Sequence, residues 1–256
     1  MLDEVKIFFE RIDPIIAQMF NSLLNNEMIV ETDIDDLCGT CHKIDSEIDG
    51  IILKHNIVPI HKIFTIVHEM GHAYFYYLDS FYPTLFRSHI SNEVMSRIFE
   101  QLFLLYLREK KIIKENDLDI YERFFHVQQL YATNKAYIIN SLLMNNIIEP
   151  QFKPEDTQLD LSNPDILDLG ILKERKKVET TCSFTANYYG YAYMLSCLFR
   201  ERYLKNPHES LKELKELSTC KRELTSLEFI HLFDNQEYIN ATNKNITRVL
   251  SKTRYK

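Results

Sequence analysis

The chain has 256 residues, of which 45% are hydrophobic, and this length suits one sizeable core, so we predict a single domain over residues 1–256. Its formal net charge of −7 argues against a nucleic-acid or anionic-membrane binder, because those partners select clustered Lys and Arg. The N-terminal residues carry charges throughout and lack the apolar core of a secretory signal, and no apolar run approaches the ~18 residues of a membrane span. The five cysteines are not spaced like a disulfide framework, so we expect a cytoplasmic protein.

Apolar residues recur at helical spacing along most of the chain, which contains only five glycines and seven prolines, so we predict a mainly α-helical fold. One stretch departs from this pattern. In "EIDGIILKHNIVP", Gly50 opens a β-branched run that Pro59 closes, which predicts a strand directly before a long helix. In chain order, we expect helices near 3–26 with a break at Pro14, and then near 60–78, 90–111, 117–148, 164–178 and 183–205, with shorter helices in the remainder.

The segment "TIVHEMGHAYFYYL" sets two histidines and a glutamate in an apolar helix. His68 and His72 are four residues apart, so they project from one helical face with Cβ atoms about 5–6 Å apart, as two imidazole ligands of a zinc ion require. Glu69 lies one step further round the helix, where it can take a proton from a metal-activated water. The alternative is a core helix in which both histidines have found hydrogen-bond partners.

A catalytic zinc ion needs a third protein ligand, and the next predicted helix offers one in "SNEVMSRIFEQLF". Glu93 follows His68 by 25 residues, an interval that suits a second helix returning antiparallel to the first. Glu100 lies two turns further along the same face, where its carboxylate could hydrogen-bond the free nitrogen of a ligating histidine. For both glutamates the alternative is an exposed helix position.

The segment "SFTANYYGYAYML" is a candidate source of a donor that stabilises an oxyanion. Tyr188 and Tyr191 lie three residues apart on one helical face, and Gly190 between them allows a close approach of backbone or substrate. Most aromatic residues at this spacing belong to a core, so a packing role remains the alternative for both tyrosines.

Taken in order, "HEMGHA", "NEVMSRIFE" and "NYYGYAY" resemble the three active-site segments of the thimet oligopeptidase and oligopeptidase F family of zinc peptidases. Thermolysin-like enzymes share Asn-Glu-x-x-Ser but follow it with Asp where this chain has Arg97, and the tyrosine segment favours the oligopeptidases. The resemblance implies a zincin-like catalytic domain with one zinc ion. It assigns the ion to His68, His72 and Glu93, with Glu69 as the general base and Glu100 supporting a ligand.

The resemblance also implies how a peptide substrate is held. Tyr188 and Tyr191 become transition-state or substrate contacts, with Gly190 as a flexible point beside them. The predicted strand falls where the family has a sheet edge next to the cleft, and a peptide could add to it as an extra strand through main-chain hydrogen bonds. The residues that this assigns to substrate binding are Leu53, His55 and Asn56.

Several departures from the family pattern are visible. Phe75 replaces a usual histidine, and Phe184 stands near an expected tyrosine. The resemblance covers roughly residues 38–205, flanked by expected N-terminal helices over 1–37 and C-terminal helices over 206–256, and the family's large N-terminal helical region is not part of it. The cleft is therefore expected to be more open, or to be walled by a second subunit in a homo-oligomer.

The sequence thus favours a zinc-dependent metallopeptidase that hydrolyses short or unfolded peptides. A first alternative is a zinc-containing peptide-binding or regulatory module with weakened catalysis. A remote alternative comes from "CGTCH", in which Cys38 and Cys41 have the spacing of a redox dithiol and, with His42, of a c-type haem attachment site. Two ordinary cysteines in a solvated, acidic loop explain the same residues.

Overall fold

The computed structural model describes residues 1–32, 39–44, 47–54, 58–81, 89–127, 129, 180–218 and 235–251. Its internal contacts divide the chain into two compact units, one formed by Met1–Phe124 with Ala192–Lys256 and the other by Phe125–Tyr191. The predicted domain boundaries remain a prediction. The described part is mainly helical with one small sheet, which confirms the predicted fold class.

The first two helices are α1 (Leu2–Ile12) and α2 (Pro14–Asn25). The predicted break at Pro14 is confirmed, because Asp13 has an extended backbone and its carboxylate accepts a hydrogen bond from the Ile15 N–H at 2.9 Å. This caps α2, and proline suits the first turn because its missing N–H would have no helical partner. The first helix packs against both central helices of the fold, and the second packs against the first helix and one of the central pair.

The sheet contains β1 (Ile29–Thr32), β2 (Gly39–Ile44) and β3 (Glu47–Lys54) in the order β1-β3-β2, with β3 parallel to β1 and antiparallel to β2. The strand predicted around Gly50 is confirmed as β3. Its predicted place at a sheet edge is wrong, because β3 is the central strand and both of its hydrogen-bonding sides are paired. Only β1 and β2 can therefore accept a further strand within the described sheet.

Two of the strands were not predicted from the sequence. The segment assigned to an acidic loop with ordinary cysteines instead contains β2, in which Cys41 pairs with Ile51. Gly50 explains how closely the chain packs here, since a Cβ on this residue would lie 2.6 Å from the carbonyl oxygen of Met28. Cys38 lies outside the described residues.

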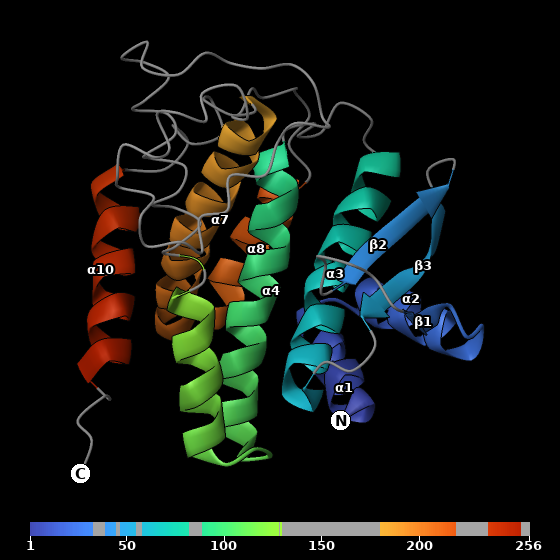
Figure 1. The fold of residues 1–256 in the computed structure, drawn as a ribbon, viewed down its shortest axis with the longest axis horizontal. Coiled ribbons are helices and arrows are strands. Elements are labelled where there is room, and N and C mark those ends of the chain that lie inside the picture. The colour runs from blue at the N-terminus through green and yellow to red at the C-terminus, as the bar shows by residue number, and fades with distance from the viewer. Residues whose placement is uncertain are drawn as a thin grey trace, which may run out of the picture. The chain divides into compact units, whose positions relative to one another are not determined.

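The centre of the fold is the pair α3 (Pro59–Phe81) and α4 (His89–Lys110), which confirms the helices predicted near 60–78 and 90–111. Figure 1 shows α3 beside α4, with the sheet against another side of α3, and α3 contacts both. The helices cross where Gly71 faces Ser96, because a Cβ at Gly71 would lie only 2.5 Å from the Ser96 Cα. Glycine at this position is what allows the two backbones to approach so closely.

The remaining described helices cover 115–127, α7 (Thr180–Lys205), α8 (Pro207–Ser218) and α10 (Asn235–Ser251). The prediction near 183–205 is confirmed, the one near 117–148 is described only in its first part, and 164–178 lies outside the described residues. None of the described helices combines the length and the apolar run that crossing a bilayer requires.

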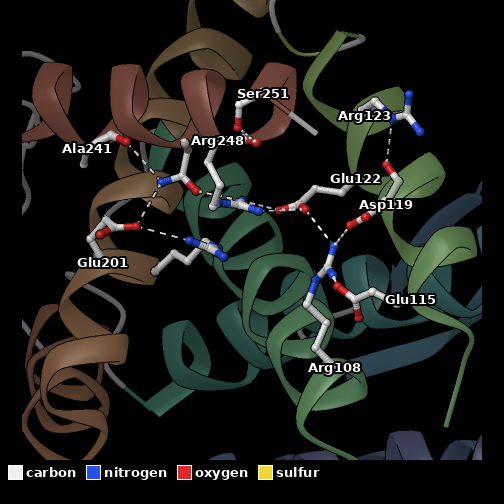
Figure 2. Close-up of polar contacts among 11 residues, drawn as sticks. Arg108, Glu115, Asp119, Glu122, Arg123, Glu201, Ala241, Arg248 and Ser251 are labelled. Atoms are coloured by element: carbon white, nitrogen blue, oxygen red, sulfur yellow. Dashed lines mark hydrogen bonds and ion pairs between the residues drawn. The ribbon is translucent and has the colours of Figure 1, made fainter. Parts of the chain in front are cut away.

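A buried ionic cluster joins several of these helices, as Figure 2 shows. Glu122, whose side chain is 1% exposed, accepts hydrogen bonds from both guanidinium nitrogens of Arg248 and, at 2.8 Å, from Arg108 on α4. Arg108 also pairs with Asp119 and Glu115. We refer below to Arg108, Glu115, Asp119, Glu122 and Arg248 as the ionic cluster.

Candidate metal centre

Two histidines of α3 face each other as the sequence predicts. His68 and His72 lie one helical turn apart, and their Nε2 atoms are 3.1 Å from each other. Their side chains are only 12% and 11% exposed, so water contributes little to their solvation. Buried apolar residues on the other faces of α3 hold the helix in place, and they include Ile66, Val67, Met70 and Ala73.

Glu93 on α4 reaches the same point from the facing helix. Its Oε2 is 3.8 Å from His68 Nε2, and its Oε1 is 3.5 Å from His72 Nε2. Ligand atoms held about 2.0–2.1 Å from a tetrahedral zinc ion lie about 3.3 Å from one another, which is close to these separations. Of the described residues that could form a metal site, His68, His72 and Glu93 are a group whose ligand atoms all lie within 4.8 Å of one another.

One oxygen of Glu93 gives an independent indication of a cation. Among the described residues, Oε2 has no hydrogen-bond partner although it is buried. A buried carboxylate oxygen without a donor is costly, and a metal ion at this point would remove that cost. The donor set of two imidazoles and a carboxylate therefore fits a divalent ion such as zinc.

The crossing of α3 and α4 at Gly71 and Ser96 is what brings these ligands together. Gly71 directly precedes His72, and Ser96 lies three residues after Glu93, so this close backbone contact is next to the candidate centre. A larger residue at either position would move Glu93 away from both histidines. The sequence predicts His68, His72 and Glu93 as ligands by their spacing, and the fold adds the close packing that brings these three side chains together.

Glu100 lies where the sequence predicted a supporting carboxylate. Its Oε1 is 3.4 Å from His68 Nδ1, and its Oε2 accepts a hydrogen bond from Arg97 Nη1 at 2.8 Å. Burial raises the pKa of Glu100, but Arg97 and His68 outweigh burial and hold it below its usual value. Burial and Arg97 lower the pKa of His68, and the Glu100 and Glu69 carboxylates outweigh them and raise it.

Glu69 is buried on α3 next to the two histidines, with 5% of its surface exposed. Burial, together with the nearby Glu93 carboxylate, raises its pKa to about 7, although His68, Arg97 and a hydrogen bond from the Cys41 backbone N–H act in the opposite direction. A carboxylate whose pKa is close to neutral can both accept and return a proton near pH 7. The geometry and the pKa thus suit the predicted general base.

Neither a protein-family model nor a curated protein sequence matches the chain. Among solved structures, the chain is similar to the X-ray structure of a protein provisionally named oligoendopeptidase F, with a TM-score of 0.64 and 16% sequence identity. The fold is oligoendopeptidase-like. The similarity covers 98% of this chain and 47% of the other, so this chain spans about half the length of the structure it matches.

The structure describes only some of the residues predicted to contact substrate. Leu53 lies on the central strand β3 with its side chain fully buried, and His55 and Asn56 lie outside the described residues. Tyr191 is half-buried on α7, where Gly190 is buried, and the side chain of Tyr188 lies outside the described part. Their roles remain predictions.

Two features near the candidate centre were missed by sequence reasoning. In the sequence, Arg97 stands out only as a departure from thermolysin-like enzymes, yet in the structure it pairs with Glu100, and its Nε lies 4.0 Å from Oε2 of Glu93. Its position four residues after Glu93 and three before Glu100 was the available signal. Cys41 had no local signal, because only strand pairing brings its backbone to Glu69.

The position of Cys41 also bears on the redox hypothesis. Burial and the nearby Glu69 carboxylate raise the pKa of the Cys41 thiol to about 12. Because the thiolate is the reactive form, this environment does not favour thiol chemistry near neutral pH. The haem hypothesis stays untested, because the side chain of His42 and all of Cys38 lie outside the described part.

Proposed function

We propose that this chain is a zinc-dependent peptidase of the oligopeptidase F type that hydrolyses short or unfolded peptides. The observation that carries the proposal is the convergence of His68, His72 and Glu93 on one point, with ligand atoms within 4.8 Å of one another and Glu69 beside them. The oligoendopeptidase-like fold supports the same function, and the order of the three motifs along the chain does so independently.

His68 and His72 would hold the ion through their Nε2 atoms and Glu93 through its carboxylate. When bound, zinc polarises the scissile carbonyl and makes water acidic enough to act as a nucleophile near neutral pH. Glu69 accepts the proton of that water and returns it to the amine that leaves. Burial of Glu69 keeps competing water away and brings its pKa to about 7, so the carboxyl can carry out both transfers.

The peptide would be held by main-chain hydrogen bonds along a strand edge. With β3 paired on both sides, the edge nearest the candidate centre is β2, because the Cys41 N–H donates to Glu69. A peptide aligned there would be recognised by its backbone, which suits substrates of varied sequence. Tyr191 and Tyr188 remain the proposed donors to the oxyanion.

The test is turnover of a quenched fluorescent peptide library by the wild type and by Glu69→Gln, with zinc content measured in both. We expect about one zinc ion per chain in each protein and a loss of activity of about a hundredfold to ten-thousandfold in the variant, because only the proton transfer is removed. Glu10→Gln, which changes an exposed glutamate of α1, is the matched control and should retain full activity. Equal activity in Glu69→Gln, or a wild type without metal, would refute the proposal.

A peptide-binding or regulatory module is the second candidate, since the chain matches about half of the solved structure. It would bind zinc and peptide without turnover. Peptide cleavage by the purified chain that disappears in Glu69→Gln excludes this alternative.

A further inference from the structure

We infer that Arg97 is a positioning residue that orients the zinc ligand His68 through Glu100. This inference rests on the proposed function, because it concerns the same metal centre. Glu93, Arg97 and Glu100 follow one another at intervals of four and three residues, so all three project from one face of α4. That face is the one turned toward His68, as the distances from both glutamates show.

The two oxygens of Glu100 have different partners. Oε2 accepts a hydrogen bond from Arg97 Nη1 at 2.8 Å, while Oε1 faces His68 Nδ1 at 3.4 Å. All three side chains are largely buried, with exposures of 13% for Arg97, 8% for Glu100 and 12% for His68. Because a guanidinium donates from a rigid planar fork, it fixes the plane of the carboxylate that it binds.

The orientation of Glu100 decides which nitrogen of His68 is available to a metal. An acceptor next to Nδ1 keeps the proton on that nitrogen and leaves the Nε2 lone pair directed at the candidate centre. Among these contacts, the hydrogen bond from Arg97 is the one that holds the Glu100 carboxylate with Oε1 directed toward His68. Arg97 therefore acts on His68 through Glu100, and it need not contact the substrate itself.

The positive charge of Arg97 also lies close to two carboxylates rather than to one. Arg97 Nε lies 4.0 Å from Glu93 Oε2, so the cation stands between the candidate ligand and the supporting carboxylate. With a divalent ion in place, the formal charges of Glu69, Glu93, Glu100, Arg97 and the ion cancel. A test must therefore keep this charge constant, and replacement of Arg97 by Lys does so while removing the planar fork.

The experiment is a double-mutant cycle with zinc affinity as the readout, measured by competition with a chromophoric chelator. In the wild-type background, Arg97→Lys should weaken zinc binding about tenfold, as is typical when a residue that supports a metal ligand is lost. In the Glu100→Gln background, the same substitution should change the affinity less than about twofold, because its route to His68 is already broken. The absorption spectrum of the cobalt-substituted protein should change in parallel.

Arg108→Lys is the matched control, since it makes the same replacement at a buried, carboxylate-paired arginine of the same helix away from the centre. It should leave zinc affinity unchanged. Equal effects of Arg97→Lys in both backgrounds, or no effect in either, would overturn the inference while leaving the peptidase proposal intact. Failure of the wild type to bind zinc would instead refute the proposed function.

If Arg97→Lys does not fold, the imidazole nitrogens of His68 are examined in the zinc-loaded wild type by nitrogen-15 NMR. An Nδ1–H resonance that is displaced in both Glu100→Gln and Arg97→Gln, with the proton retained, supports the inference. A proton on Nε2, or an Nδ1–H resonance that Arg97→Gln leaves unchanged, overturns it.

Discussion

The candidate metal centre and the core of the ionic cluster around Glu122 are both largely buried sets of ionisable side chains, but their internal arrangement differs. In the ionic cluster, the Glu122 carboxylate is matched by guanidinium donors from Arg108 and Arg248 (Figure 2). In the metal centre, the Nε2 atoms of His68 and His72 face each other and an oxygen of Glu93. One set pairs donors with acceptors, and the other directs three possible metal-ligand groups at a common point.

This difference separates a structural role from a binding role. Paired charges satisfy one another and fix the helices that carry them, so their effect is on folding. Convergent ligand atoms do so less completely, since Oε2 of Glu93 is buried without a hydrogen-bond donor among the described residues, and its burial costs free energy until a cation is bound. Breaking the first set should therefore reduce stability without changing metal affinity, and breaking the second should do the reverse.

The largest expected effect is on stability, from Glu122→Ala. The substitution leaves the partly buried Arg108 and Arg248 without the buried carboxylate that they share, and breaking such a pair should cost up to about 3–5 kcal/mol. Urea unfolding of the metal-free protein measures the loss. Glu115→Ala is the control, since Glu115 pairs with the same Arg108 but is 62% exposed, and it should cost about 0–1 kcal/mol. Equal losses of unfolding free energy in the two variants would show that the burial of Glu122 does not decide how much the ionic cluster stabilises the fold.

The next largest expected effect is the stabilisation of the folded protein by zinc. Here the candidate metal centre should matter and the ionic cluster should not. At a zinc concentration of about 100 times the dissociation constant, binding to the native state alone should add about 2.7 kcal/mol to the free energy of unfolding. Glu93→Gln should abolish this gain, because it removes the ligand that α4 contributes. Glu115→Ala should retain it. Unfolding curves with and without zinc provide the measurement, and a gain that persists in Glu93→Gln would place the metal elsewhere.

Sequence periodicity was sufficient for the features that are local in the chain. The interval between His68 and His72 places both on one face of α3 independently of the rest of the fold. Asp13 and Pro14 likewise define the boundary between α1 and α2 within three residues. The proximity of Glu93 to both histidines was also predictable, because two consecutive antiparallel helices can bring residues about 25 positions apart in the chain side by side.

Features that depend on pairing between distant segments were not predicted. The order β1-β3-β2 places the strand around Gly50 at the centre of the sheet, and no pattern within that strand distinguishes a central from an edge position. The contact between Glu122 and Arg248 joins residues 126 positions apart. Arg97 is intermediate, since its spacing from Glu100 was visible but its function depends on how closely α3 and α4 approach.

The close approach of α3 and α4 is the basis of the last prediction. It combines the smallest expected loss of stability with the clearest separation between a structural role and a metal-binding role. Gly71→Ala would place a Cβ 2.5 Å from the Ser96 Cα, so the helices must move apart at a cost of about 1–3 kcal/mol. Because the crossing lies beside His72, the shift should also move Glu93 away from the histidines and weaken zinc binding.

Gly50→Ala is the control for this prediction, because its Cβ would lie 2.6 Å from the Met28 carbonyl oxygen, which is a comparable clash that does not involve α3 or α4. Both variants should lose similar stability in thermal unfolding, whereas only Gly71→Ala should lose zinc affinity. If both lost zinc affinity equally, general loosening of the fold would explain the result. A loss confined to Gly71→Ala would show that the separation of α3 and α4 itself sets the distances between the ligands.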